Sequence, residues 1–316
     1  MSASTTRTTR RTFLQAAAGA AANLAPAVHG AGAASRARPN VLFIICDDLN
    51  DSVEGMGGHP QARTPHIHRL MERGIQFTNA HNNQPWCAPS RASLWSGLYP
   101  FTTGYHGRGH WRDHPVLAGT VTLIEHLRRS GYAVYGTGKL FHNGHEPKDL
   151  YTQYGHDPDF GPWPWDGKES TRVPLVIATP ELRAGGQQCD RPVSLIDLYP
   201  TIAELCGLPP EPNAPGNRRR LDGHSLRPFL DNPRSGAWDG PAVAVTQLGA
   251  ADKAHYSVRG RRWRYTLCSN GEEELYDHTA DPHEWNNLAA DPKFAAVKAD
   301  LKRQLLRITG KAPANP

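Results

Sequence analysis

The stretch Cys87-Ala88-Pro89-Ser90-Arg91-Ala92-Ser93-Leu94-Trp95-Ser96-Gly97 guides the interpretation of the whole chain. Pro89 suits the first turn of a helix, where no amide donor is needed, and Gly97 suits the position just past the end. The stretch therefore predicts a helix with Cys87 at its N-terminus. The unpaired amides and the helix dipole favour an anion there, and Arg91 adds donors that match a tetrahedral oxyanion.

Apolar runs and helical patterns alternate on both sides of this stretch. Residues 41–46 form a continuous apolar run and predict a strand that is buried on both faces of a parallel sheet. Further strands are predicted at residues 75–80, 132–137 and 173–178, and helices at 64–74, 122–131 and 196–206. This alternation predicts an α/β fold: a mostly parallel mixed sheet flanked by helices, with right-handed crossovers.

The last third of the chain has a different pattern. Short runs at residues 242–246, 255–259, 262–267 and 274–276 predict antiparallel strands, and residues 293–308 predict a helix that packs on them. We therefore expect three parts: a leading segment at residues 1–37, an α/β domain at 38–235 and a smaller C-terminal α+β subdomain at 236–316.

Polar residues stand where two of the predicted strands end. Asp47 and Asp48 follow the first strand, and open α/β sheets bind ligands at the carboxyl ends of their strands. Two adjacent carboxylates repel each other unless a cation neutralises them, and hard oxygen ligands select Ca²⁺ or Mg²⁺. A solvated turn with a helix cap is the alternative. Lys139 and His142 follow the strand at residues 132–137 in the same way.

The leading segment resembles a twin-arginine (Tat) export signal. Arg10-Arg11-Thr12-Phe13-Leu14-Gln15 precedes a weakly apolar alanine-rich run at residues 16–22 and small residues near 25–27 and 31–33. We expect an exported protein, periplasmic or extracellular, that uses the Tat export machinery as a partner. An alanine-rich helix on a cytosolic protein is the alternative. The run is too short to span a membrane, so no membrane span is expected.

Composition and charge are those of an ordinary globular protein. Apolar residues make up 38% and charged residues 21%. The net charge of +5 mildly favours an anionic partner, although arginines of the leading segment inflate it. Arg218-Arg219-Arg220 is interpreted as a solvated loop, with polyanion contact as the alternative. We expect no nucleic-acid partner.

The chain has 5 cysteines, an odd number with no CxxC pair. This argues against a zinc site or a dense disulfide framework. One or two disulfide bonds remain open for an exported protein.

These motifs together resemble the sulfatase family, and most closely its iduronate-2-sulfatase-like branch. Cys87-Ala88-Pro89-Ser90-Arg91 with Gly97 resembles the sulfatase signature. The other matching segments are Asp47-Asp48, Gly138-Lys139 with His142, Leu221-Asp222-Gly223, Ser225-Leu226, Glu274-Leu275-Tyr276-Asp277, Asp281-Pro282 and Asn286-Asn287-Leu288. The resemblance extends over nearly the whole chain after Arg38.

The resemblance implies a sulfuric ester hydrolase that acts on a sulfated sugar or aryl ester. Cys87 would be oxidised to formylglycine by a formylglycine-generating enzyme, and the hydrate of this aldehyde would attack sulfur. Arg91 would orient the hydrate. Lys139 would grip the sulfate and His142 would polarise the hydrate or the sulfate, because cations placed where charge develops lower the barrier.

The resemblance also implies a calcium ion. Asp47, Asp48 and the modified Cys87 would be ligands of Ca²⁺, which cancels charge in the transition state.

One part of the family pattern is absent. Between His142 and the strand at residues 173–178, sulfatases of this type carry a longer stretch with an Asp-His-Gly or Asp-Asn-Gly motif, which supplies further calcium ligands. Here only residues 143–168 join the two, and no such motif occurs. The chain therefore resembles a sulfatase with an internal deletion. Asp157, Asp159 and Asp166 are candidate substitutes, with exposed loop carboxylates as the alternative.

Two function classes follow from this pattern. The first is a sulfuric ester hydrolase. The second is a catalytically impaired sulfatase remnant or a protein that binds sulfated glycans, which the absent half of the calcium site favours. A phosphatase or phosphonate hydrolase on a related fold agrees less well with Cys87, Pro89 and Arg91.

Overall fold

The computed structural model describes residues 38–107, 109–142, 144–155, 172–182, 185–213, 220–249 and 253–310. The leading segment at residues 1–37 and the candidates Asp157, Asp159 and Asp166 lie outside these ranges. Residues 39–316 form one compact unit, separate from residues 1–38. The boundary expected at residue 235 stays a prediction.

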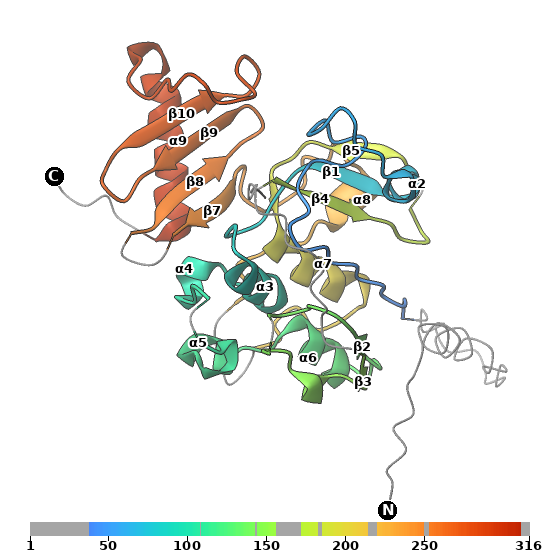
Figure 1. The fold of residues 1–316 in the computed structure, drawn as a ribbon. Coiled ribbons are helices and arrows are strands. Elements are labelled where there is room, and N and C mark those ends of the chain that lie inside the picture. Colours follow the sequence, from blue (N-terminus) through green and yellow to red (C-terminus); the bar gives the residue numbers. More distant parts are fainter. Residues whose placement is uncertain are drawn as a thin grey trace, which may run out of the picture. The chain divides into compact units, whose positions relative to one another are not determined.

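A mixed four-stranded sheet lies in the α/β part of the chain (Figure 1). Its central strand is β1 (Ile75–His81), which pairs with β4 (Arg172–Ile177), β5 (Gln187–Cys189) and β6 (Val193–Ser194). The pairings with β5 and β6 are parallel, and the pairing with β4 is antiparallel with an irregularity between Phe77 and Ala80. The sheet is thus mixed, as expected.

Helices predicted from local signals are confirmed. α2 (Pro65–Arg73) begins after Thr64, and α3 (Cys87–Ser96) ends at Gly97 with φ of 69°. α6 (Leu123–Arg129) is capped by Thr122, whose side chain accepts a hydrogen bond from the amide of Glu125. The remaining helices of the described α/β part are α4 (Pro100–Thr103), α5 (Pro115–Ala118), α7 (Leu198–Leu205), α8 (Arg227–Asp231) and the 3₁₀ helices Trp111–Asp113, Lys148–Leu150 and Leu195–Asp197.

The prediction of a buried strand at residues 41–46 is wrong. These residues form no strand, and the side chains of Leu42 and Ile44 are 86% and 68% exposed. A buried parallel strand needs a hydrogen-bonded neighbour on each side. Among the described residues no strand lies beside this segment; β2 (Tyr135–Gly136) pairs instead with β3 (Gln153–Tyr154) in a separate two-stranded sheet. Asp47 and Lys139 therefore do not lie at the edge of one shared sheet.

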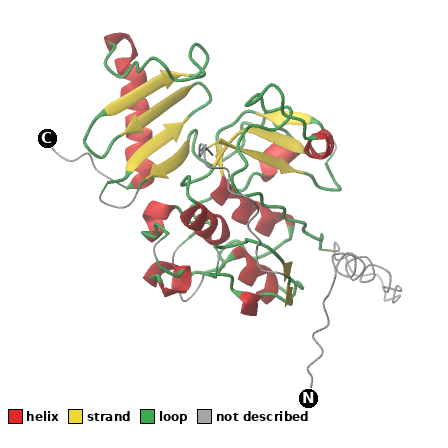
Figure 2. Ribbon diagram, in the orientation of Figure 1, coloured by secondary structure: helices red, strands yellow, loops and turns green. Residues whose placement is uncertain are grey.

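The C-terminal strands and helix are confirmed. Strands β7 (Ala244–Leu248), β8 (His255–Arg259), β9 (Trp263–Leu267) and β10 (Glu273–Asp277) form an antiparallel sheet in the order β10-β9-β8-β7. After the 3₁₀ helix Pro292–Phe294, α9 (Ala295–Thr309) packs along one face of this sheet (Figure 2). The buried side chains of Leu301 and Leu305 join α9 to the core of the sheet.

Two main cores hold these elements. The larger one gathers side chains from β1, α3, α6 and α7, including Phe77, Trp95 and Tyr199. The second lies under the C-terminal sheet and also takes in Tyr99 and Ile196 from the α/β part. All five cysteines are free thiols, with no disulfide among the described residues. No helix in the described ranges has the length and apolar character needed to cross a bilayer.

Candidate functional site

Helix α3 places Cys87 and Arg91 one turn apart at its N-terminal end. Cys87 is its first residue and is half-buried, whereas Arg91 is only 6% exposed. The amide of Ser90 donates to the carbonyl of Trp86, which closes the first turn. The amides of Cys87 and Ala88 form no hydrogen bond with any described residue, and such orphan donors attract an anion.

Arg91 and Lys139 meet at the carboxylate of Asp47. Nη2 of Arg91 donates to Oδ1 of Asp47 at 3.0 Å, and Nζ of Lys139 donates to Oδ2. Burial alone would raise the pKa of Asp47, but the hydrogen bonds from Lys139 and Arg91 outweigh it and hold the pKa below its ordinary value. Two cations and one anion leave this group with a net positive charge.

The loop that carries Lys139 is held by groups that the motif did not reveal. Arg91 donates to the carbonyls of Lys139 and Leu140, and Nε1 of Trp95 also donates to Leu140 at 2.6 Å. Oε1 of Glu146 accepts from the amides of Leu140 and Phe141 at 2.8 and 2.9 Å. Glu146 lies within residues 143–168, which join His142 to the next predicted strand and carry no periodic pattern of apolar residues.

His142 stands beside a row of imidazoles. Its ring centroid lies 5.4 Å from that of His145, which in turn lies 4.6 Å from that of His110. Burial, followed by the charges of Lys139 and other neighbouring cations, lowers the pKa of His142, so the ring is neutral at neutral pH. No sequence spacing had connected His110 with this site, because the three imidazoles meet only through the tertiary fold.

The structure brings together some of the predicted site residues and leaves others apart. Asp47, Arg91 and Lys139 form one bonded group, and the charges of Lys139 and Arg91 reach His142. Asp48 is exposed at a φ of 53° and forms no hydrogen bond or ion pair with a described residue. The predicted roles of all these residues stay predictions.

Tyr105 and Gly107 lie close to the N-terminal end of α3. Gly107 has a φ of +83°, and a Cβ there would lie 3.1 Å from Cδ of Pro89, so a larger residue at this position would be strained. Burial, and then the nearby Cys87, raises the pKa of the Tyr105 hydroxyl, which donates to the carbonyl of Gly109 at 3.1 Å. Tyr105 is therefore a protonated neighbour of Cys87.

Two family models match consecutive parts of the chain. Residues 39–164 match the model described as Sulfatase. Residues 165–311 match the model described as N-sulphoglucosamine sulphohydrolase, C-terminal. Together they extend over both the α/β part and the C-terminal sheet. The chain belongs to the sulfatase family.

Each curated sulfatase matches only part of this chain. A "Sulfatase" of Formosa agariphila is 37% identical over 41% of this chain and 28% of its own length. The human N-acetylgalactosamine-6-sulfatase is 31% identical over 43% of this chain and 29% of its own length. The human iduronate 2-sulfatase is 40% identical over 33% of this chain and 19% of its own length. The matched part thus spans less than a third of each of these relatives.

Solved structures share the fold. A protein solved with its substrate D-glucosamine-2-N,6-O-disulfate has a TM-score of 0.69 at 15% identity and covers 86% of this chain and 98% of its own. The phosphonate monoester hydrolase of Agrobacterium radiobacter has a TM-score of 0.68 at 16% identity, with coverage of 86% and 96%. At these identities the likeness concerns the sulfatase fold and not the substrate.

The described residues of this sulfatase do not fit a calcium ion. Ca²⁺ takes about six to eight oxygen ligands. Both oxygens of Asp47 are bonded to cations, and Asp48 is exposed. Within the described ranges no group of three His, Cys, Asp or Glu side chains is placed to hold a metal. The expected set of Asp47, Asp48 and Cys87 is therefore not assembled as a calcium site.

Proposed function

We propose that this sulfatase hydrolyses sulfate esters of sugars or aryl alcohols, with formylglycine derived from Cys87 as the nucleophile. The observation that carries the proposal is the position of Cys87 as first residue of α3, with orphan amides and a net positive group one turn away. A helix N-terminus stabilises an anion, and cations that are fixed in advance stabilise charge that develops during reaction.

The exposure of Cys87 supports its proposed modification. Cys87 is half-buried and forms no disulfide, so its thiol is free and partly accessible. Once formed, a formylglycine hydrate would supply the oxygen that attacks sulfur.

The protein's own side chains bind and orient the sulfate. Arg91 is fixed by Asp47 and by two carbonyls, so its guanidinium does not reorganise when an anion arrives. Lys139 adds a second positive charge. His142 is neutral at neutral pH, so a ring nitrogen is able to take up a proton near these cations.

The names of similar proteins indicate which kind of sulfate ester the protein hydrolyses. The names of the curated relatives include an N-acetylgalactosamine-6-sulfatase and an iduronate 2-sulfatase, and one structural neighbour holds D-glucosamine-2-N,6-O-disulfate. We infer a sulfated glycan or monosaccharide as substrate. A formylglycine-generating enzyme is the implied modifying partner.

The test begins with co-expression of the protein and a formylglycine-generating enzyme. Mass spectrometry of the peptide that contains Cys87 should show the aldehyde, and the purified protein should release sulfate from 4-nitrophenyl sulfate or a sulfated monosaccharide. Cys87→Ala should abolish turnover. Cys268→Ala, which removes another partly exposed thiol, should not. An unmodified Cys87, or equal turnover in Cys87→Ala, would contradict the mechanism.

Binding of sulfated glycans without hydrolysis is the second candidate. It is favoured by the cations that engage Asp47 and by the missing calcium cluster in the described residues. In that case the modified protein would bind a sulfated sugar, lose binding in Lys139→Met, and release no sulfate.

Export through the Tat pathway is proposed from Arg10-Arg11 and the following apolar run. Residues 1–37 fused to a folded reporter should direct it across the membrane. The double change Arg10→Lys and Arg11→Lys should retain it in the cytoplasm, and unchanged export would refute the proposal.

A further inference from the structure

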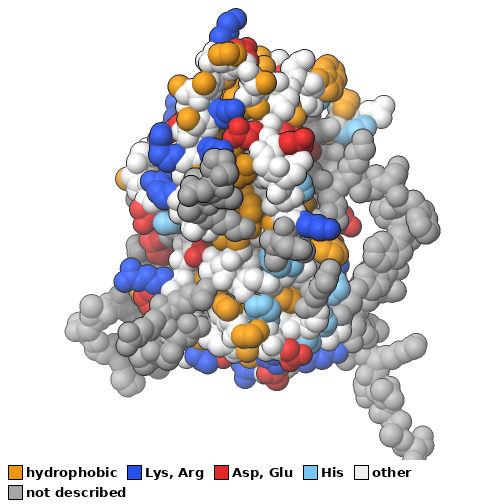
Figure 3. All heavy atoms as spheres, turned by 90° about the vertical axis from the view of Figure 1, so that its left-hand side faces the viewer, with side chains coloured by type: hydrophobic (Ala, Val, Ile, Leu, Met, Phe, Trp, Pro, Cys, Tyr) orange, Lys and Arg blue, Asp and Glu red, His pale blue; other side chains and the backbone are white. Residues whose placement is uncertain are grey.

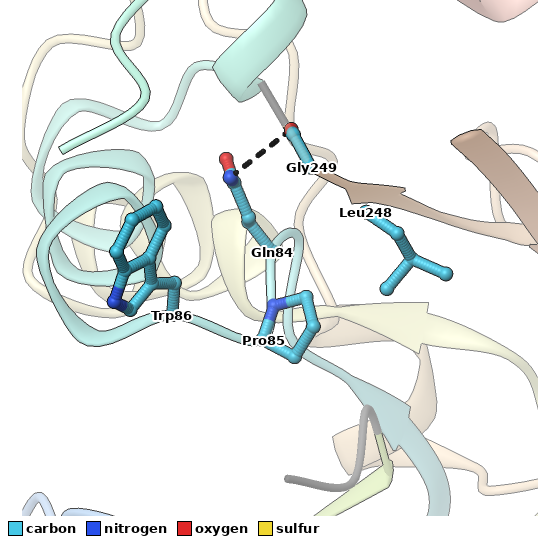
Figure 4. A pocket seen from close by; sticks show the side chains of 5 residues that line it. All are labelled: Gln84, Pro85, Trp86, Leu248 and Gly249. Carbon is cyan, nitrogen blue, oxygen red and sulfur yellow. Dashed lines mark hydrogen bonds between the residues drawn. The ribbon is translucent and has the colours of Figure 1, made fainter. Parts of the chain in front are cut away.

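A cavity of about 300 Å³ lies beside the segment that leads into α3. It is lined by Gln84, Pro85 and Trp86 on one side and by Leu248 and Gly249 at the end of β7 on the other (Figure 4). Trp86 directly precedes Cys87. The cavity is therefore formed by the backbone that positions the proposed nucleophile, although none of its lining residues has a role in the proposed reaction.

The walls of this cavity are fixed by hydrogen bonds between β7 and the end of β1. The amide of Gln247 donates to the carbonyl of Asn83 at 2.9 Å, and Nδ2 of Asn83 donates to the carbonyl of Val245 at 3.2 Å. Nε2 of Gln247 donates to the carbonyl of Gly249 at 3.1 Å. A site whose walls are ordered before binding loses less conformational entropy when a ligand arrives.

Trp86 is exposed where its neighbours are buried. Trp86 is 54% exposed, whereas Asn83 and Gln84, which shortly precede it in the sequence, are 2% and 1% exposed. Tryptophan is highly buried on average, and an aromatic ring at the mouth of a cavity offers a rigid apolar face. The exposure of Trp86 thus points to a planar or flat ligand surface.

Gln84 is buried in the wall behind this apolar face. Its Nε2 donates to the carbonyl of Gly249 at 3.5 Å, the bond drawn as a dashed line in Figure 4. Its amide oxygen is covered by protein, so Gln84 fixes the wall of the cavity and offers no acceptor to a ligand.

The lining excludes the sulfate group itself. None of the five lining residues carries a charge, whereas Arg91, one turn after Cys87 in α3, and Lys139 carry positive charge in the site described above. An anion therefore goes to the cations, and the cavity takes the neutral part of the same ligand. A volume of about 300 Å³ is at the lower end for small-molecule sites and suits a single ring.

We propose that this cavity binds one pyranose ring of the sulfated sugar, with the C–H face of the ring on Trp86. This inference rests on the proposed function, since it assumes that the ligand is a sulfate ester. It assigns specificity for the sugar to Trp86 and leaves recognition of the sulfate to Arg91 and Lys139.

The test measures binding by isothermal titration calorimetry in the Cys87→Ala background, where no turnover occurs. The probes are N-acetylglucosamine-6-sulfate and inorganic sulfate. Trp86→Ala should weaken binding of the sulfated sugar by about 3- to 10-fold and leave inorganic sulfate unchanged. Trp86→Phe should retain most of the affinity. Trp285→Ala is the matched control, because Trp285 is 80% exposed in the C-terminal subdomain and does not line the cavity.

The outcomes separate this inference from the proposed function. The role of the cavity would be overturned if Trp86→Ala weakened binding of both probes equally or of neither. It would also be overturned if Trp285→Ala weakened binding of the sulfated sugar as much as Trp86→Ala. Hydrolysis by the modified protein with an unchanged KM for the sulfated sugar in Trp86→Ala would also overturn it while the proposed function stands. Trp86-dependent binding without any hydrolysis would support the cavity and refute the hydrolase.

Discussion

Arg91 is the side chain on which the local order of the site depends. It is 6% exposed and contacts Asp47, the carbonyl of Lys139 and the carbonyl of Leu140, so it joins α3 to two other segments. The motif around Cys87 predicted a donor for an oxyanion at this position. The bonds from Arg91 to two backbone carbonyls were not predictable, because they require the fold of residues far along the chain.

Removing the guanidinium should therefore destabilise the protein. Arg91→Met removes the donor to the carbonyl of Lys139 and to Oδ1 of Asp47, while the carbonyl of Leu140 keeps its hydrogen bond from Trp95. We expect a loss of about 2–4 kcal/mol in the free energy of unfolding, below the value for a fully buried pair because Asp47 is 37% exposed at its side chain. Urea denaturation at pH 7 measures it. The control Arg129→Met breaks an exposed pair with Glu125 and should cost less than about 1 kcal/mol; equal costs would contradict the prediction.

The imidazole of His142 offers a second measurement at this scale. Burial first, and then Lys139, lowers its pKa from the ordinary value of 6.5. Titration by NMR with labelled histidine should give a pKa below 6.5 in the native protein. Lys139→Met should move it upward, although burial keeps it below the ordinary value. An unchanged pKa in Lys139→Met would show that this charge does not act on the ring.

Elements differ in how far the sequence determines them. α2, α3 and α6 were predictable because their start and stop signals are local: Thr64 with Pro65, Gly97 and Thr122. The strands of the C-terminal sheet were predictable because each pairs with its neighbour along the chain. The segment at residues 41–46 was not, because its apolar pattern indicates a buried strand only where flanking strands exist.

One carboxylate adds ion pairs to the apolar contacts that attach α9 to its sheet. Glu273 of β10 accepts a hydrogen bond from the Tyr265 hydroxyl at 2.7 Å and pairs with Lys298 and Lys302 of α9, both at 3.0 Å. Burial would raise its pKa, but these three partners lower it from 4.5 to about 2. The carboxylate therefore stabilises the fold only while it is ionised.

Glu273→Gln should lower stability at pH 7 by about 1–3 kcal/mol. Because the folded pKa is depressed, this contribution is complete above pH 4.5 and is lost as the pH falls from 4.5 towards 2. Denaturation curves of the two proteins should therefore converge over that interval. Glu272→Gln is the control, since its exposed side chain pairs with no described residue, and it should change stability by less than about 0.5 kcal/mol. A pH-independent difference would contradict the prediction.

At the scale of the whole molecule, the surface of the described residues combines dispersed charge with an exposed apolar segment. Figure 3 shows Lys and Arg side chains lying among Asp and Glu side chains on one face. Residues 41–46 are different: Leu42 and Ile44 point outwards, while Phe43 packs on Trp95 with ring centroids 5.5 Å apart. An extended, apolar segment without hydrogen-bonded neighbours is a template for association.

Charges on the outward side should suppress that association. We expect the double change Leu42→Lys and Ile44→Lys to raise the fraction of monomer, measured by size-exclusion chromatography with light scattering over a range of concentrations. Phe43→Lys, on the inward side, should lower thermal stability instead. If the double variant associates as strongly as the native protein, residues 41–46 are not the adhesive surface.

The end of α3 has a consequence for the order of synthesis. The carbonyl of Gly97 accepts hydrogen bonds from the amides of Asp222 and Gly223 at 2.8 and 3.3 Å, and the Asp222 carboxylate accepts from the amide of Tyr99. None of these contacts can form until the ribosome has added residue 223, about 6–25 s after residue 97 at about 5–20 residues per second. During that interval the Cys87 segment lacks these contacts, so the proposed modification of Cys87, if it requires an extended chain, would have this time in which to occur.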